Sequence, residues 1–525
     1  MLARHLPSLG QAGRGDALHQ GQRQLHARRR GHDPFHGRRY AVLRSEHRRL
    51  VERRRHDAQD LRDLLSAPRA SSLAGHVNHG CSNMLRIDEV PNSDGFPDRC
   101  DVAVIGGGII GVSTAYELAR RGISVALLEK GIIGAEQSGR NWGWVRQQNR
   151  DLYELPLAMQ SLKRWAELSD ELGEEIGFRK SGILYGSEQP ADVAQWETWL
   201  GKARALGFDS QLLSARELAA RVPNGRAKWA GGVWSYSDGR AEPSKAAPAI
   251  ARGAQRLGAR VHQICAVRGL DISAGRVSGV WTERGLIAAD SVVLAGGAWS
   301  ALFCRHHGID LPAVNVIGTA LRTAEAPAVI DGCFSGPNFA MRRRLDGGYT
   351  IAVPGYGRME IAPQNLRHAV KFRKMFRSKL SKKLKFRVAQ RFFGGPEGSA
   401  TWRHDDITPF EEMRVFNPSP DAEWPTRAID HVAAVFPDLS GLRVAHAWAG
   451  AIDTTPDLVP VMSRVDSMPG LVIASGFSGH GFGLGPGAGM LVSRIVTDDV
   501  SGIDLNPFRL TRFSDGTRLA SPELM

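Results

Sequence analysis

The sequence predicts an α/β fold in which a Rossmann-like domain, assembled from separated stretches of the chain, is joined to an antiparallel-sheet domain. Three short runs of β-branched and aliphatic residues, at 101–105, 291–295 and 470–475, each lead into a glycine-rich turn. Such runs are typical of strands that are buried on both faces of a parallel sheet. The third run begins more than 350 residues after the first, so a sheet that contains all three is discontinuous in sequence.

The first run, Asp101–Ile105, opens a complete strand–turn–helix–strand unit. It continues into Gly106–Gly111, which matches the pattern GxGxxG, then into a predicted helix at 112–121 and a strand at 123–128 that ends at Glu129. In such a unit the glycines permit a tight turn, close approach of a pyrophosphate and close helix–strand packing, while the acid binds ribose hydroxyls. The helix N-terminus supplies amides for the phosphates. These features in register predict a dinucleotide site rather than a glycine turn that binds nothing.

The other two runs distinguish between possible dinucleotides. The strand at 291–295 enters the turn at Gly296 and Gly297, and the strand at 470–476 enters a glycine-rich loop at 477–486. A helix is predicted after this loop, from Ala488 to about Thr497. A nicotinamide-binding Rossmann domain is normally contiguous and needs no such distant loop. A flavin domain built from both ends of the chain does need it, so the sequence favours FAD.

Six short segments support this interpretation through their order along the chain. They are Val104–Gly111, Gly134–Gly143, Asp238–Pro243, Val293–Trp299, Thr455–Asp457 and Gly476–Gly481. Together they resemble the D-amino-acid oxidase, glycine oxidase and sarcosine oxidase superfamily (DAO-type), on its D-amino-acid dehydrogenase-like branch. The segments cover residues 100 to about 500, and residues 1–83 lie outside the resemblance.

The resemblance implies an FAD site that draws on four of these segments and on a few residues outside them. Its residues are Gly106, Gly108, Ile109, Ile110, Gly111, Glu129, Lys130, Gln137, Ser138, Arg140, Asn141, Trp142, Gly143, Val267, Ala295, Gly296, Gly297, Trp299, Gly476, Gly479, His480, Gly481 and Leu484. The segment from Gln137 to Gly143 and the loop at 479–484 are expected beside the isoalloxazine. Reduction places negative charge on that ring, which donors at a helix N-terminus stabilise.

One position departs from the sarcosine oxidase pattern. Sarcosine oxidases of this superfamily attach their flavin to a cysteine five residues before the threonine of Thr455–Asp457, and here that position is Gly450. The FAD is therefore predicted to be non-covalent.

The resemblance also implies a reaction. A hydride passes from the carbon beside an amine to flavin N5, and the resulting imine hydrolyses. The expected substrate is a small amine or amino acid such as a D-amino acid, glycine or sarcosine, and the electron acceptor is oxygen or a quinone. The alternative is a flavin-binding assembly or redox-structural protein without amine turnover.

Candidate catalytic residues are few, because the flavin performs the chemistry. A substrate carboxylate favours a guanidinium, and Arg342 and Arg344, on one side of a predicted strand before Asp346-Gly347, are the first candidates. The competing interpretation is that these charges are solvated. Arg146 and Arg140 are secondary candidates. His480 is predicted to be a flavin neighbour or structural residue rather than an acid–base group, and Trp142 and Trp144 are expected to line the flavin cavity.

A basic segment at 366–392 carries eleven Lys or Arg and no acid. Its apolar residues Phe372, Phe376, Leu380, Leu384, Val388 and Phe392 recur every four residues, which predicts a helix with an apolar stripe. That helix either packs on the substrate domain or binds anionic lipid, which would give a dehydrogenase access to membrane quinone.

The first 83 residues differ from the rest in composition, with 16 Arg, no Lys, seven acidic residues and nine of the 17 His. The acids argue against a transit peptide, and a nucleic-acid tail or a disordered extension upstream of an initiator at Met84 remain as alternatives. Removing this surplus of nine leaves +5 of the formal +14, so we expect no nucleic-acid binding. The five scattered cysteines predict no metal site or disulfide framework. A cytoplasmic protein is expected, soluble or attached peripherally to the inner face of the membrane.

These observations give a domain plan. Residues 1–95 form the N-terminal extension and 501–525 a C-terminal tail. The FAD-binding domain comprises 96–150, 228–310 and 440–500, and the antiparallel-sheet substrate-binding domain comprises 151–227 and 311–439.

Overall fold

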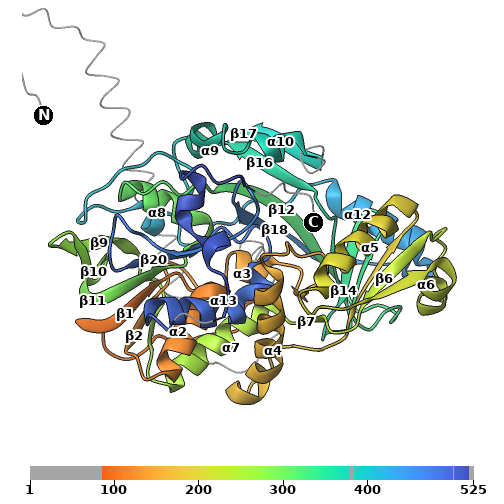
Figure 1. Cartoon of the computed structure of the whole chain (residues 1–525), viewed down its shortest axis with the longest axis horizontal. Helices are drawn as coiled ribbons and strands as arrows, with labels where there is room; N and C mark the ends of the chain where they lie inside the picture. Colours follow the sequence, from red (N-terminus) through yellow and green to blue (C-terminus); the bar gives the residue numbers. More distant parts are fainter. Residues whose placement is uncertain (1–84, 379–382, 500–501, 520–525) are drawn as a thin grey trace, which may run out of the picture. The chain divides into compact units, whose positions relative to one another are not determined.

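The computed structural model describes residues 85–378, 383–499 and 502–519, and these residues build two sheets flanked by helices (Figure 1). Met84 and the predicted extension before it lie outside the described residues, as does Leu380 of the basic segment. No helix among the described residues is long and apolar enough to cross a membrane.

The first sheet has eight strands and contains the glycine unit. Five of its strands run parallel in the order β20 (Leu471–Ser475), β11 (Gly285–Leu294), β1 (Arg99–Ile105), β2 (Val125–Leu128) and β8 (Arg260–His262). The antiparallel strands β19 (Val461–Arg464), β10 (Arg276–Thr282) and β9 (Val267–Ser273) complete it. The parallel strands come from widely separated stretches of sequence, which confirms the predicted discontinuous α/β arrangement.

Alternate side chains of β1 enter two different cores. Val102 and Val104 pack with α2 (Ile109–Arg120), α7 (Pro243–Arg256) and α13 (Gly481–Val496), which lie together beside the sheet in Figure 1. Ala103 and Ile105 pack on the other face, with residues from β9, β10 and α8 (Ser300–His306). Burial on both faces explains why the strand is apolar throughout rather than alternating.

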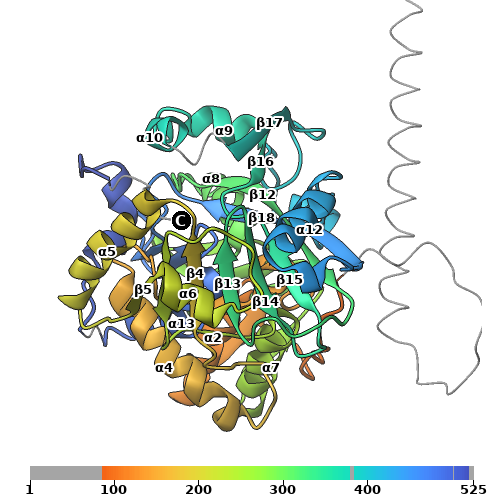
Figure 2. The same ribbon diagram turned by 90° about the vertical axis from the view of Figure 1, so that its right-hand side faces the viewer.

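The second sheet has ten strands and is mainly antiparallel. Its order is β17 (Leu384–Val388), β16 (Gly357–Ile361), β12 (Val314–Thr323), β15 (Tyr349–Ala352), β14 (Phe339–Arg343), β13 (Cys333–Gly336), β4 (Ile183–Ser187), β6 (Gly231–Ser235) and β5 (Gln211–Ser214), with β18 (Val444–Thr454) paired to β12. The helices α5 (Pro190–Arg204) and α12 (Trp424–Val435) lie on opposite sides of these strands (Figure 2).

Shorter elements lie between the strands of the two large sheets. They are α3 (Gln137–Arg140), β3 (Trp144–Val145), which pairs with β7 (Gly239–Arg240), α6 (Ala215–Arg221), α9 (Pro363–His368), α10 (Arg373–Arg377) and α11 (Pro409–Glu412). The longer α4 (Leu155–Leu172) packs on α13.

Two strands lie in segments that the sequence pattern assigns to the FAD-binding domain, but they pair elsewhere. β6 pairs with β4 and β5, and β18 pairs with β12 along almost its whole length. Both therefore belong to the second sheet, whereas the sequence pattern predicts that the segments beginning at 228 and 440 open FAD-domain stretches. Strand pairing joins residues far apart in sequence, so the local pattern of either strand does not reveal its partner.

The C-terminal glycine-rich helix begins at Gly481, seven residues before the predicted start at Ala488. Its glycines allow close helix packing, because a Cβ at Gly485 would lie 2.5 Å from Ile109 of α2 and one at Gly489 2.4 Å from Ser113. A Cβ at Gly487 would lie 2.7 Å from Ser161 of α4. Tertiary packing thus compensates for the poor helix propensity of glycine.

The predicted helical stripe at 366–392 is wrong. This segment forms α9, α10 and the strand β17, which extends the second sheet by pairing parallel with β16. Phe372 is buried whereas Val388 is 71% exposed, so the apolar residues share no single face. Pairing with the free edge of β16 makes this stretch a strand, although its apolar residues recur with a helical period.

Candidate active site

A large cavity is lined by residues of both sheets and has a volume of about 1410 Å³. Ligand pockets for a single small molecule typically enclose about 300–1,000 Å³. The cavity therefore has room for a dinucleotide together with a small substrate.

The turn after β1 has a geometry that only glycine permits. Gly106 has φ +106°, and a Cβ there would lie 2.5 Å from the carbonyl oxygen of Ala295. A Cβ at Gly111 would lie 1.9 Å from the carbonyl oxygen of Gly106. Both contacts are with backbone atoms, which cannot move aside for a Cβ. Glycine at these two positions therefore leaves the space in front of the N-terminus of α2 that a pyrophosphate needs.

Glu129 lies at the end of β2, where a ribose-binding acid is expected. Its carboxylate accepts hydrogen bonds from the amides of Gly107, at 2.6 Å, and Gly131, at 2.7 Å. Burial raises the pKa of Glu129, although Lys130 and these two amides oppose the rise. Beside it, the Ser138 hydroxyl accepts a 2.8 Å hydrogen bond from the amide of Ile109 and so fixes α3 against the start of α2.

The second glycine-rich loop connects β20 to α13. The amide of Gly476 donates to Asp453 at 2.6 Å, and the chain then passes through left-handed conformations at Ser478 (φ 51°) and Gly479 (φ 85°). His480 follows as the residue before the first turn of α13. The first amides of α13 therefore begin at the cavity, of which Gly481 is a lining residue.

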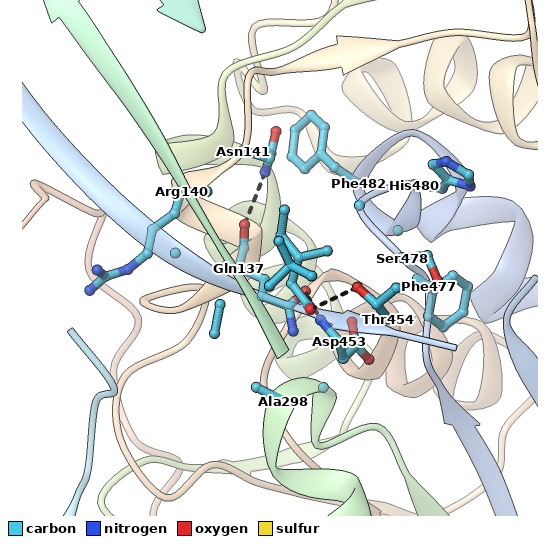
Figure 3. A pocket seen from close by; sticks show the side chains of 18 of the residues that line it. Gln137, Arg140, Asn141, Ala298, Asp453, Thr454, Phe477, Ser478, His480 and Phe482 are labelled. Carbon is cyan, nitrogen blue, oxygen red and sulfur yellow. Dashed lines mark hydrogen bonds between the residues drawn. The ribbon is translucent and has the colours of Figure 1, made fainter. Parts of the chain in front are cut away.

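His480 is buried, and its Nδ1 lies 3.0 Å from the carboxylate of Glu154. Burial, together with the charge of Arg150, lowers the pKa of His480 to about 4. The ring is therefore neutral at pH 7, with Nδ1 donating to Glu154. Figure 3 shows His480 and Phe482 on one side of the cavity and Gln137 and Asn141 on the other.

Most residues of the predicted FAD site line this cavity. They are Gly106, Gly108, Ile109, Ile110, Glu129, Lys130, Gln137, Ser138, Arg140, Asn141, Trp142, Val267, Ala295, Gly296, Gly297, Trp299, Gly479, His480 and Gly481. Four others, Gly111, Gly143, Gly476 and Leu484, do not line it but form the layer behind it. A Cβ at Gly143, for example, would lie 2.6 Å from Nε of Arg342.

The structure does not bring the first-choice substrate arginines into the cavity, which corrects that prediction. Arg342 is completely buried and forms a bidentate ion pair with Glu242, at 2.8 and 3.1 Å. Arg344 pairs with Asp346 at 3.0 Å and lies 4.0 Å from Glu242. Burial alone would raise the pKa of Glu242, but Arg342 and Arg344 lower it to about 2. Glu242 is 100 residues from Arg342 in sequence, so this partner could not be recognised locally.

The secondary candidates do line the cavity. Arg140 directs its guanidinium away from the cavity centre in Figure 3, towards Asn417 and the carbonyl oxygen of Ala449. Arg146 approaches only the hydroxyl of Tyr185, at 3.4 Å, and forms no ion pair with any described residue. Neither arginine forms an ion pair with a described residue, but the donors of Arg140 are engaged by carbonyl and amide oxygens, whereas Arg146 has only the distant hydroxyl of Tyr185.

A second such residue, Arg150, is absent from the sequence-based candidates. It is buried, yet its guanidinium makes one hydrogen bond, from Nε to the carbonyl oxygen of Arg146 at 3.4 Å, and Nη1 has no partner among the described residues. Burial and the charge of Arg146 lower the pKa of Arg150 to about 9, against the opposing charges of Glu154 and Asp238, which lie near it without forming an ion pair. No local sequence signal distinguishes this arginine from a surface charge. Trp144 and Tyr185 line the same region of the cavity.

The comparisons with known proteins agree with this geometry. The model of the family "FAD dependent oxidoreductase" (DAO) matches residues 101–495. The chain belongs to this family. It is 26% identical over 437 residues to a glycine oxidase of Geobacillus kaustophilus, covering 79% of this chain and 97% of that protein. It is 25% identical over 431 residues to sarcosine oxidase subunit beta of Arthrobacter, covering 79% and 91%.

A solved structure supports the same assignment. L-amino acid deaminase from Proteus myxofaciens, in complex with anthranilate, superposes on this FAD dependent oxidoreductase with a TM-score of 0.77 at 30% identity, covering 82% of this chain and 96% of that one. The cradle at Gly106, the carboxylate of Glu129 and the cavity volume all fit the FAD that the family requires.

Proposed function

We propose that this FAD dependent oxidoreductase oxidises the carbon–nitrogen bond of a small amino acid. The observation that carries the proposal is the pair Arg146 and Arg150, two guanidiniums at the cavity without a carboxylate partner among the described residues. An arginine binds a carboxylate through two parallel, charge-assisted hydrogen bonds. The relatives named above act on glycine, sarcosine or L-amino acids, which all carry a carboxylate beside the amine.

The residues around the cavity divide into two groups by role. The glycine turn, Glu129 and Val267 would bind the ADP half of FAD, and the segments 137–143 and 479–484 would lie along its ring. Bound FAD supplies a hydride acceptor for the substrate α-carbon, and the resulting imine hydrolyses in water. The first amides of α13 bring partial positive charge to the place where reduction adds negative charge.

The substrate end positions the amino acid and excludes water. Arg146 and Arg150 orient the carboxylate, which fixes the α-carbon relative to the ring. The aromatic rings of Trp144 and Tyr185, 6.1 Å apart and edge to face, form an apolar wall beside them. Neutral His480, held by Glu154, supports the start of α13 and is proposed as a flavin neighbour rather than a proton donor.

Non-covalent FAD is part of the proposal. Gly450 lines the cavity where sarcosine oxidases of the superfamily have the flavin-linked cysteine, and no cysteine among the described residues lines it. Acid precipitation of the purified enzyme should leave all flavin in the supernatant. Flavin in the protein pellet would contradict non-covalent binding.

Anaerobic bleaching of the flavin tests the amine oxidation. The panel contains D- and L-amino acids, glycine, sarcosine and proline, and at least one of them should reduce the flavin. No bleaching by any of them would favour a flavin-binding assembly protein without turnover. Reoxidation of the reduced enzyme by air or by a quinone analogue then distinguishes oxidase from dehydrogenase.

Peripheral membrane contact through residues 366–392, together with the adjacent Phe393, is a second candidate property. Val370, Val388 and Phe393 are each at least 70% exposed, and they lie among exposed arginines such as Arg387 and Arg391. Exposed apolar and cationic side chains together favour an anionic lipid surface. Flotation with anionic vesicles should recover the wild type, and Arg387→Glu/Arg391→Glu should abolish recovery. The matched control is Lys202→Glu/Arg216→Glu, and equal recovery of all three proteins would exclude lipid binding.

A further inference from the structure

The charges that line the cavity are unevenly distributed. The lining acids are Glu129, Glu136, Asp192 and Asp453, and the lining bases are Lys130, Arg140, Arg146, Arg150, Lys374, Arg377, Lys383 and Arg518. Glu129 and Asp453 accept backbone amides, Asp192 accepts from Ser187, and Glu136 pairs with Lys130 at 2.7 Å. Eight bases against four acids leave an excess of positive charge around the cavity.

Two of these positive charges, Arg146 and Arg150, lie in the inner part of the cavity. Their like charges disfavour each other, and burial of an unpaired charge costs free energy unless an anion compensates it. The carboxylate of a simple amino acid such as glycine brings one negative charge to this pair. A second carboxylate on the same molecule would compensate the second guanidinium.

Further cations surround the outer part of the same cavity. Arg377 ends α10, Lys383 precedes β17, and Arg518 lies near the end of the described chain; all three are exposed and line the cavity. None of them forms an ion pair with a described acid, and the ammonium of Lys383 donates only to the carbonyl oxygen of Pro354, at 3.3 Å.

The cofactor phosphates do not account for these outer cations. The phosphate-binding turn lies at the start of α2, and Figures 1 and 2 both show α10 at the top of the view and α2 in its lower half. Asp192 is an exposed acid in the lining, but cations outnumber it there. A cavity mouth, the opening to solvent, that is lined mainly by cations concentrates anionic ligands and accelerates their association. The outer and inner cations therefore favour the same class of ligand.

We propose that the preferred substrate is an amino acid whose side chain ends in a carboxylate. Arg146 and Arg150 bind its two carboxylates, and Arg377, Lys383 and Arg518 attract it to the mouth. This inference rests on the proposed amino-acid oxidation and specifies its substrate class.

Isosteric substrate pairs provide the main test. Anaerobic flavin reduction by the FAD-loaded enzyme is measured with aspartate against asparagine and with glutamate against glutamine, for both enantiomers. One additional charged hydrogen bond corresponds to a preference of about tenfold or more for the acid in kcat/KM. That preference should fall as salt is added, since the mouth cations are exposed.

A binding measurement gives a second readout that needs no turnover. Glutarate should perturb the flavin absorption spectrum with a Kd about tenfold or more below that of butyrate, which has one carboxylate. Equal dissociation constants would overturn the second carboxylate site even if neutral amino acids reduce the flavin. Tight glutarate binding without reduction by any amino acid would instead refute the proposed oxidation, and with it this inference.

Variants at the mouth separate substrate attraction from membrane contact. Arg377→Gln/Lys383→Gln should lower kcat/KM for the acidic substrate several-fold at low salt and leave that for its amide unchanged. The control Lys202→Gln/Arg216→Gln removes the same charge from two exposed residues of α5 and α6 that do not line the cavity, and should change neither. An equal effect on acid and amide, or a loss confined to vesicle flotation, would overturn the assignment of these cations to substrate.

Discussion

Arg342 and Arg150 are both buried arginines, but their environments are opposite. Arg342 is held by both carboxylate oxygens of Glu242 and by the carbonyl oxygen of Trp142, so its donors are engaged inside the protein. Within the described part of the chain, the guanidinium of Arg150 has a single long hydrogen bond, and its Nη1 has no partner beside the cavity. An arginine that is satisfied by the fold stabilises it, whereas one that the fold leaves unsatisfied is available to a ligand.

Buried carboxyl groups show the same contrast. Arginines lower the pKa of Glu242 to about 2, despite its burial. Glu397 has two amide donors, the backbone of Asn315 at 2.7 Å and the side chain of Asn365 at 3.2 Å, but no cationic partner among the described residues. Burial raises the pKa of Glu397 to about 8. The charge of Arg342 therefore keeps Glu242 ionised at neutral pH, whereas Glu397, which has amide donors alone, favours its protonated form.

The largest effect is expected at Arg342. Arg342→Met leaves Glu242 buried without its partner and should lower the free energy of unfolding by about 3–5 kcal/mol, measured by urea denaturation. Arg344→Met, at a partly exposed pair, should cost about 1 kcal/mol or less. An unchanged free energy of unfolding with a raised KM for Arg342→Met would return this residue to the substrate site.

Arg150→Met should have the opposite profile. The pKa of Arg150 is lower in the folded protein than its ordinary value of 12.5, so its charge opposes folding at pH below about 9. The free energy of unfolding should therefore stay constant or rise, while kcat/KM falls about 10- to 100-fold through the loss of charged hydrogen bonds. A loss of stability with unchanged kinetics would make Arg150 a structural residue like Arg342.

Glu397 provides the pH test of the comparison. Its pKa of about 8 exceeds the ordinary 4.5, so the folded state holds a proton that the unfolded state releases. The stabilisation is complete below about pH 4.5 and disappears as the pH rises to about 8, by up to about 1.4 kcal/mol per pH unit. From about pH 5.5 to about pH 7.5, wild type should lose about 2.5 kcal/mol relative to Glu397→Gln in urea unfolding. Parallel pH profiles would show that Glu397 is ionised in the folded protein.

The smallest effect is expected at Tyr185. Its hydroxyl lies 3.4 Å from Nη1 of Arg146, beyond the usual range for a strong hydrogen bond. Tyr185→Phe should raise KM about twofold and leave kcat unchanged in steady-state kinetics. A tenfold change would mean that the hydroxyl itself contacts the substrate.

The nucleotide end is almost completely predictable from the sequence. A strand, a glycine turn, a helix and an acid act through neighbours in the chain, so the local pattern suffices to assign the turn at Gly106 and the acid at Glu129. The glycine loop at 476–481 is assigned in the same way. The helix that follows it is longer than its sequence predicts, because glycines are poor helix formers until α2 and α4 pack against them.

The substrate end is not predictable in this way. The basic segment at 366–392 has a helical period, but β16 offers an unpaired edge and the second half of the segment becomes β17. The arginines before Asp346 have the expected spacing, but one of them, Arg342, donates to both carboxylate oxygens of Glu242. Arg150 carries no motif.

The sequence by itself determined the discontinuous α/β domain, its FAD-binding turn and its family, because these depend on short segments whose residues interact with near neighbours. Only the tertiary structure decided which arginines remain free for a substrate. That property depends on whether a distant carboxylate folds back onto each guanidinium, and the pairing of Arg342 with Glu242, beside the isolation of Arg150, is set by the packing of the whole chain.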